Sequence, residues 1–176
     1  MVQTRRLATP DDLPAIAALM GRAMAVLQAA FLTPEQVAAS AASMGLDTQL
    51  IADRTYFLIE EDGALVGCGG WGKRATLYGG DHAALRDDTL LDPATDAARI
   101  RAMYTDPAHA RRGIGRTILS LCEDAARAAG FRSIEMMATR SGEPLYTACG
   151  YAVVERVERM APTGVAVPGA VMRKAL

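Results

Sequence analysis

The chain has 176 residues, of which 51% are apolar and 22% charged, and its 19 basic and 20 acidic side chains leave a net charge of −1. This length and composition predict one folded domain over residues 1–176 and exclude a disordered or linker-dominated protein. Because the net charge is near zero and the cations are spread along the chain, we expect no nucleic-acid partner.

The chain carries no segment that is typical of a membrane protein or of a secreted one. Its longest uncharged runs, 23–34 and 160–172, are shorter than the roughly 18 residues that a bilayer requires. Charged residues precede any apolar run, so we expect no secretory signal and a cytoplasmic location. Cys68, Cys122 and Cys149 form neither a disulfide pattern nor a metal-ligand spacing, which predicts buried thiols and no metal site.

The first half of the chain predicts two helices, three strands and a long loop. Thr-Pro pairs at Thr9 and Thr33 place an N-cap residue before a proline, which is the start signal of a helix. The helices predicted from them reach Leu27 and about Met44. The predicted strands cover 3–7, 55–60 and 64–73, the last two as a hairpin, and the loop covers 78–95.

The second half is more regular. An apolar stripe from Ile114 to Ala128 predicts a long helix that ends at Gly130, with Phe131 folded back onto its last turn in a Schellman motif. The other predicted segments are strands over 98–105, 133–138, 151–159 and 165–174, and a short helix over 142–149. This order of elements predicts a mixed α/β fold.

Two glycine-rich segments compete for the role of a cofactor site. Residues 67–72 read G-x-G-x-x-G, as in the dinucleotide fingerprint, but they lie within a hairpin strand instead of between a strand and a helix. We therefore predict a bulged strand and a close backbone approach there, and no nicotinamide or flavin site. The chain also lacks the P-loop motif.

The second glycine-rich segment, residues 110–116, lies between a strand and the long helix. Backbone N–H groups at such a turn form an anion site together with the partial positive charge of the helix N-terminus. Gly113 and Gly115 lack the Cβ atoms that would keep a diphosphate away. Arg111, Arg112 and Arg116 add positive charge. The turn alone leaves an ordinary surface helix start open as the alternative.

The motifs from Arg99 to Tyr151, taken in order, resemble the Gcn5-related N-acetyltransferase (GNAT) superfamily. They are a strand followed by Asp-Pro, the turn at 110–116, a helix, a strand and the segment Pro-Leu-Tyr-Thr-Ala-Cys-Gly-Tyr at 144–151. The resemblance implies a three-layer α+β fold with a mostly antiparallel seven-stranded sheet, splayed between its fourth and fifth strands, and helices on both faces. It also implies acetyl-CoA as co-substrate, without a metal.

The resemblance assigns the cofactor-binding residues. They are Arg111, Arg112, Gly113, Ile114, Gly115 and Arg116 for the pyrophosphate, the main chain of Met103, Tyr104 and Thr105 for the pantetheine and acetyl carbonyl, and Thr139. Many family members carry Gln or Arg where Ala110 stands, and Asn where Thr139 stands. The turn binds the pyrophosphate through backbone N–H groups, and the Thr139 hydroxyl can form a hydrogen bond with a pantetheine amide. These two departures therefore affect the affinity for acetyl-CoA and not the assignment of the site.

Tyr146 matches the tyrosine that the family carries on its short helix, and as a phenol it can protonate a departing thiolate. Packing between helix and sheet is its structural alternative. An N–H group of Met103, Tyr104 or Thr105 is expected to stabilise the oxyanion. No carboxylate or histidine lies on the strand 99–105, so the general base stays open between Glu60, Asp81, His82 and a water chain.

Four residues are candidates for the acceptor pocket: Trp71, Asp81, His82 and Arg101. Arg101 shares a strand face with Arg99 and would bind a substrate carboxylate or form an ion pair. Trp71 would line the pocket or pack the hairpin.

The sequence predicts direct transfer of an acetyl group from acetyl-CoA to a primary amine of a small molecule or peptide. An acyl-enzyme route through Cys149 and a catalytically silent acyl-CoA-binding or regulatory module are the alternatives. Homodimers are common in the superfamily, so the resemblance also implies a homodimer.

Overall fold

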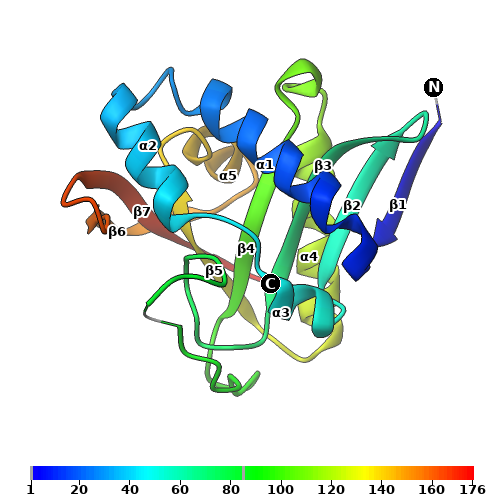
Figure 1. The fold of residues 1–176 in the computed structure, drawn as a ribbon. Helices are drawn as coiled ribbons and strands as arrows, with labels where there is room; N and C mark the ends of the chain where they lie inside the picture. The colour runs from blue at the N-terminus through cyan, green and yellow to red at the C-terminus, as the bar shows by residue number, and fades with distance from the viewer. Residues whose placement is uncertain (1, 85) are drawn as a thin grey trace.

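The computed structural model describes residues 2–84 and 86–176. Its centre is a seven-stranded sheet in the order β1-β2-β3-β4-β5-β7-β6 (Figure 1). The strands are β1 (Gln3–Leu7), β2 (Tyr56–Glu61), β3 (Ala64–Gly72), β4 (Ala98–Thr105), β5 (Ser133–Thr139), β6 (Ala152–Met160) and β7 (Ala166–Ala175). The helices are α1 (Leu13–Leu27), α2 (Pro34–Ser43), α3 (Thr48–Ala52), α4 (Ile114–Ala128) and α5 (Glu143–Ala148), with 3₁₀ turns η1 (Pro10–Asp12) and η2 (Pro107–His109).

Each predicted strand and helix is present, and the mixed α/β fold is confirmed. The Thr33 cap is formed, because its side chain accepts from the backbone N–H of Gln36. Gly130 has φ +94°, and the Phe131 N–H donates to the Ala126 carbonyl over 3.1 Å, which is the predicted Schellman end of α4. Helix α3 was not predicted, because five residues are too short to show an apolar period.

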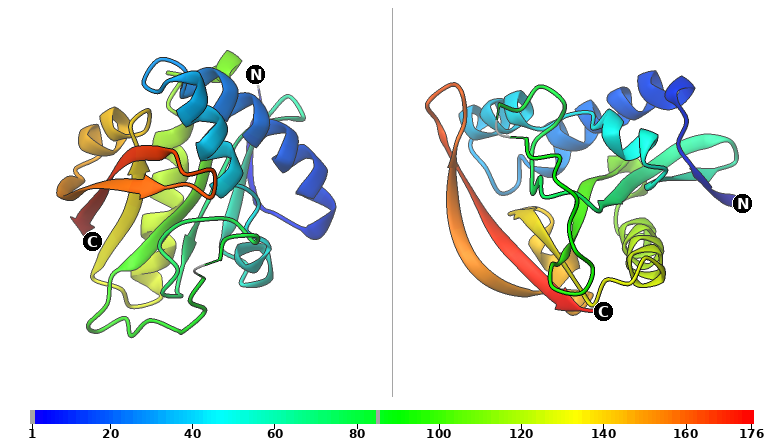
Figure 2. Two further views of the ribbon diagram at one scale, coloured as in Figure 1. Left: turned by 60° about the vertical axis from the view of Figure 1, so that its left-hand side comes forward. Right: turned by 90° about the horizontal axis from the view of Figure 1, so that it is seen from below.

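Helices cover both faces of the sheet, as the right-hand view of Figure 2 shows, with α1 and α2 on one side and α4 on the other. Ile16 and Leu19 of α1 belong to a core cluster on one side, and Ile114 and Ile118 of α4 belong to a second cluster. The central strands of the sheet therefore lie between two packed layers.

Among the described residues, no helix is both long enough and apolar enough to span a bilayer.

The glycines of β3 allow α4 to approach the sheet closely, as predicted. A Cβ on Gly69 would lie 2.7 Å from Cγ2 of Ile118, and a Cβ on Gly67 would collide with Ile114. The pairing of β3 with β4 shifts register between Cys68 and Gly70, where two steps along β3 oppose three along β4. The extra residue of this bulge therefore lies on β4 and not on the glycine strand where it was predicted.

The sheet is splayed between β4 and β5, which confirms the expectation from the resemblance. These strands are parallel and pair at only two positions, Ala98 with Ile134 and Arg99 with Glu135. Further along, Ala102 adopts φ +48° and its carbonyl accepts a hydrogen bond of 2.7 Å from the Tyr56 hydroxyl. The remaining length of β4 thus has no ladder to β5, and its main-chain edge is left for another partner.

Candidate active site

The glycine turn lies where β4 ends and α4 begins. Gly113 is the N-cap of α4 with φ +84°, and Arg111 also has a positive φ, +66°. No side chain of the described residues caps this helix end. The N–H groups of its first turn can therefore bind an anionic ligand.

The three arginines of the turn have different surroundings. Arg111 and Arg116 are exposed. Arg112 pairs with the buried carboxylate of Glu61 at 3.0 Å, which fastens the turn to the end of β2. All three cations are thus exposed, and Arg112 also anchors the turn to β2.

Gly115 serves the packing of α5 on α4. A Cβ at this position would lie 2.7 Å from Cδ2 of Leu145, whereas a Cβ at Gly113 would meet nothing within 4 Å. Gly113 is needed for its backbone conformation, and Gly115 for the contact between two helices. Ile114 between them is buried in the core. The glycine turn is therefore in direct packing contact with α5, the helix that carries Tyr146.

Tyr146 lies on α5 with its ring folded back over Gly142. A Cβ on Gly142 would come within 3.2 Å of the tyrosine hydroxyl. The ring makes an edge contact with Tyr151 at 6.1 Å between centroids. Within the described residues the hydroxyl has no hydrogen-bond partner, and burial, followed by the charges of Cys122 and Cys149, raises the pKa of Tyr146 to about 12. This phenol is therefore a proton donor at all physiological pH values.

The splayed part of β4 directs its side chains to opposite faces. Met103 packs against Gly69 on the α4 side, whereas Tyr104 is buried in the cluster formed with α1. Burial, followed by the charges of Cys68 and Tyr146, raises the pKa of Tyr104 well above its ordinary value. Thr105 ends the strand beside Gly115, and Thr139 ends β5 with its hydroxyl 3.1 Å from that of Ser141.

Arg101 is buried and fully engaged by the protein. Its guanidinium donates to the Asp47 carboxylate at 2.8 Å and to the Thr76 and Gly79 carbonyls at 2.7 and 2.5 Å. Burial lowers the pKa of Arg101 from its ordinary value, and the Asp47 carboxylate opposes that shift. These contacts tie the loop after β3 to the start of α3, so Arg101 has a structural role in holding these segments together.

The other three pocket candidates also have structural contacts. Trp71 lies in the core with its ring against Phe131, at 5.9 Å between centroids. Asp81 accepts from the Thr48 N–H at 3.0 Å, and Nε2 of His82 lies 2.7 Å from the Ala42 carbonyl. The structure brings together the turn, β4 and Tyr146. Asp81 and His82 lie in the loop after β3, whereas Trp71 pairs with Ile100 of β4 and packs in the same core cluster as Ile114.

Neither a general base nor a nucleophilic cysteine is set up by the described side chains. Glu60 binds Arg6 at the β1 edge, and this hydrogen bond lowers the pKa of Glu60. Asp81 and His82 hold the loop, as above. The Cys149 thiol has no hydrogen bond or ion pair among the described residues and thus lacks the activation that a nucleophile requires.

Sequence reasoning missed Arg159, which lies on the opposite side of the splay. The Arg159 guanidinium of β6 lies over the ring of Tyr78, 5.2 Å from its centroid. Arg159 also interacts electrostatically with Tyr104. No signal in the sequence marks this contact, since Arg156 on the same strand is exposed and is the same residue type.

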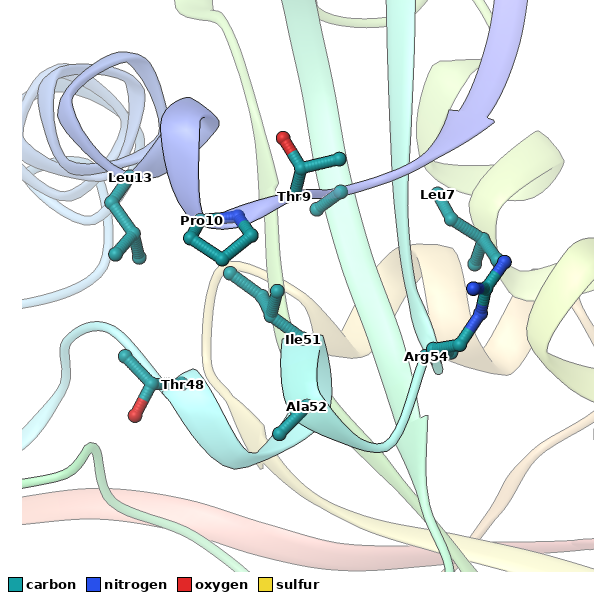
Figure 3. Close-up of a pocket in the computed structure, with 9 residues that line it drawn as sticks. Leu7, Thr9, Pro10, Leu13, Thr48, Ile51, Ala52 and Arg54 are labelled. Carbon is teal, nitrogen blue, oxygen red and sulfur yellow. The ribbon is translucent and has the colours of Figure 1, made fainter.

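A cavity lies at the N-terminal end of α1 (Figure 3). It has a volume of about 440 Å³ and is lined by Leu7, Ala8, Thr9, Pro10, Leu13, Thr48, Ile51, Ala52 and Arg54. The later turns of α1 approach the glycine turn instead, where Arg22 pairs with Asp106 at 2.7 Å. The cavity is therefore separate from the group of residues around Tyr146.

Comparisons with known proteins agree with this geometry. The model of the acetyltransferase (GNAT) family matches residues 23–151. No curated protein matches the chain.

Three solved structures illustrate the likeness of fold. A GCN5-related N-acetyltransferase from Rhodopseudomonas palustris is 23% identical, with a TM-score of 0.73 over 100% of this chain and 99% of that chain. The PaiA N-acetyltransferase from Thermoplasma acidophilum in complex with coenzyme A is 13% identical, with a TM-score of 0.67 over 100% of both chains. YncA from Salmonella typhimurium with its cofactor acetyl-CoA is 20% identical, with a TM-score of 0.65 over 100% of this chain and 95% of that one.

Proposed function

Because this chain belongs to the acetyltransferase (GNAT) family, we propose that it transfers an acetyl group from acetyl-CoA directly to the primary amine of a small molecule or peptide. The observation that carries the proposal is the divergence of β4 from β5 directly beside the glycine turn. Tyr146 lies on α5, which packs against that turn through Leu145 and Gly115. All of these residues come from one chain, so the proposal needs no second copy.

The residues of the site fit the parts of acetyl-CoA. The first turn of α4 offers N–H donors and a positive dipole end to the pyrophosphate, and the exposed Arg111 and Arg116 add charge. The unpaired edge of β4 at 103–105 offers main-chain groups to the amides of the pantetheine, as a neighbouring strand would. Thr139 lies at the end of β5, and its hydroxyl, 3.1 Å from that of Ser141, can still donate or accept one further hydrogen bond. The structures of PaiA and YncA were determined with coenzyme A and acetyl-CoA, which supports the same class of ligand here.

In the proposed reaction the neutral amine forms a bond to the acetyl carbonyl carbon and the carbon–sulfur bond of the thioester breaks. A backbone N–H in the segment 103–105 stabilises the oxygen while it carries negative charge. Tyr146 donates its phenolic proton to the departing sulfur. The ammonium proton of the acceptor leaves to water, because Glu60, Asp81 and His82 are engaged elsewhere.

Two tyrosine hydroxyls provide the test. Tyr146→Phe should lower kcat by about 100-fold or more and leave the Kd of acetyl-CoA unchanged, since general-acid catalysis contributes about 10²–10⁴. Free CoA release is measured with a panel of the twenty amino acids, their carboxamides and short peptides, and Kd is measured by titration. An unchanged kcat in Tyr146→Phe would remove this residue from the mechanism.

The matched control is Tyr151→Phe. The Tyr151 hydroxyl donates to the buried carboxylate of Glu123 at 3.0 Å, whereas the Tyr146 hydroxyl has no partner among the described residues. Tyr151→Phe should therefore cost about 1 to 3 kcal/mol of stability and leave kcat in place. Tyr146→Phe should instead lower kcat and leave the free energy of unfolding unchanged.

A further inference from the structure

Arg159 is a half-buried cation without an acidic partner. Its Nη1 lies 3.5 Å from the Ser43 hydroxyl, at the limit of a hydrogen bond. Its Nε is enclosed and has no hydrogen-bond partner. The face of the guanidinium is covered by the Tyr78 ring. No carboxylate of residues 2–84 or 86–176 pairs with it, so donors at the guanidinium tip remain for a ligand.

Arg101 provides a comparison, because it is an arginine of the same fold with a structural role. Its guanidinium has a carboxylate and two carbonyl acceptors. A cation taken out of water without such partners is unfavourable, and burial accordingly lowers the pKa of Arg159. A charge kept at this cost suits the binding of an anion.

Arg159 lies on the acceptor side of the proposed transfer site. It pairs with Val167 across the β6–β7 hairpin, two residues before Gly169, and Gly169 pairs with Thr139 at the end of β5. Gln28 is only 4% exposed, and it contacts the same end of α2 as Arg159, through Met44 beside Ser43. The Gln28 side-chain oxygen also has no hydrogen-bond partner. Two enclosed and unpartnered polar atoms thus adjoin the end of α2, as expected for a site that a polar ligand completes.

We propose that the acceptor amine carries a carboxylate group, as a free amino acid does, and that Arg159 binds this carboxylate while Tyr78 holds the guanidinium in place. This proposal rests on the proposed acetyl transfer and names its substrate class. A guanidinium fork matches the two oxygens of a carboxylate and binds them with paired, charge-assisted hydrogen bonds. One uncompensated positive charge balances one carboxylate, whereas a phosphate would bring nearly twice that charge.

The test compares each of the twenty free amino acids with its carboxamide, which keeps the amine and the side chain and removes the negative charge. With acetyl-CoA, free CoA release gives kcat/KM for both forms. We expect at least one free acid to exceed its own amide by about 10- to 100-fold, the range that a hydrogen-bonded charge provides. Arg159→Met should remove that preference and leave the rate of the amide unchanged, and Arg159→Lys should restore part of it.

Arg5→Met is the control, because Arg5 is an exposed cation on the edge strand β1 and its loss changes the net charge equally. This variant should keep the full preference. Equal rates for acids and amides in the wild type, or an equal loss of both in Arg159→Met, would overturn the carboxylate site and leave acetyl transfer standing.

A second readout separates the proposal from the proposed function. Thermal unfolding is measured with coenzyme A and each amino acid, a mixture in which no acetyl group can be transferred. A rise in Tm with an acid, absent with its amide and lost in Arg159→Met, supports the carboxylate site even if no CoA release is detected. In that case the proposed acetyl transfer would be wrong, and the carboxylate site would still be supported. If no acid raises Tm and none reacts faster than its amide, the carboxylate site is wrong.

Discussion

Two arginines, Arg101 and Arg159, contact residues near the ends of α2 and α3 and should respond in opposite ways to the same change. Arg101→Met removes the nearer of two cations that hold the buried Asp47 carboxylate, at 2.8 Å against 3.1 Å for Arg86, so we expect a loss of about 1.5 to 3 kcal/mol in the free energy of unfolding. Arg159→Met removes a cation with no acidic partner among the described residues, so we expect a change near zero or a small gain. Urea unfolding of both variants measures this difference. Equal losses would show that Arg159 has a structural partner.

The pKa of Tyr146 makes a prediction about the pH dependence of the reaction. Tyr146 acts in its protonated form, and burial raises its pKa to about 12, so its activity is lost only as the pH rises through that value. An ordinary phenol would cause this loss near pH 10. We therefore expect kcat to rise with pH as the acceptor amine loses its proton, and then to stay level up to pH 10. A fall in kcat that begins below pH 9 contradicts a protonated Tyr146 as the acid.

Residues of the site that lie in one contiguous motif were predictable, and those assembled by the tertiary fold were not. Gly113 and Tyr146 occur in ordered local patterns, so the resemblance placed them without a structure. Arg101 was expected at the surface or in the pocket, but the loop after β3 folds over it, which no local pattern indicates. The contact of Arg159 with Tyr78 likewise joins a strand near the end of the chain to a distant loop.

At the scale of elements, α5 positions the Tyr146 ring through a glycine. Gly142 has helical φ and ψ of −86° and −25°, so alanine is allowed by the backbone, but its Cβ would lie 2.6 Å from Cε2 of Tyr146. Gly142→Ala should therefore displace the ring and lower kcat by about 10-fold or more, because a small misplacement of a reacting group has large effects on rate. Its stability should change by less than about 1 kcal/mol. Steady-state kinetics and thermal unfolding check both parts.

Gly21→Ala is the matched control for this change. Gly21 lies within α1, and a Cβ there would meet nothing within 4 Å. The substitution should stabilise the protein by about 0.5 to 1 kcal/mol through helix propensity and leave kcat unchanged. If both variants lose activity equally, the ring position is not the cause.

The elements themselves were largely predictable because their caps and periods are local. The Thr-Pro starts, the Schellman end at Gly130 and the apolar stripe of α4 each gave the correct element. The bulge at Ala102 was not predictable, because an alanine with φ +48° is stabilised by its surroundings, including the Tyr56 hydroxyl on the neighbouring part of the sheet. The splay that follows from it was expected only through the resemblance.

At the scale of the whole molecule, one ligand should join the two halves of the sheet. Strands β1 to β4 and strands β5 to β7 are linked in the ladder only through the two residue pairs between β4 and β5. Acetyl-CoA bound along β4 would contact both halves and the start of α4. Binding to the folded state alone stabilises it, and at about 100 times Kd this amounts to about 2.7 kcal/mol.

The measurement that tests the central claim most directly is thermal unfolding with acetyl-CoA, with NAD and ATP as comparison ligands. We expect a rise of roughly 5 to 11 °C in the wild type with acetyl-CoA alone. Gly113→Glu should abolish the rise by placing a carboxylate at the anion site. Gly164→Glu is the control, since Gly164 has a similar φ of +80°, lies in the β6–β7 turn and has open space around it. It should keep the rise. No rise in the wild type at millimolar acetyl-CoA, or an equal rise in Gly113→Glu, would contradict the account.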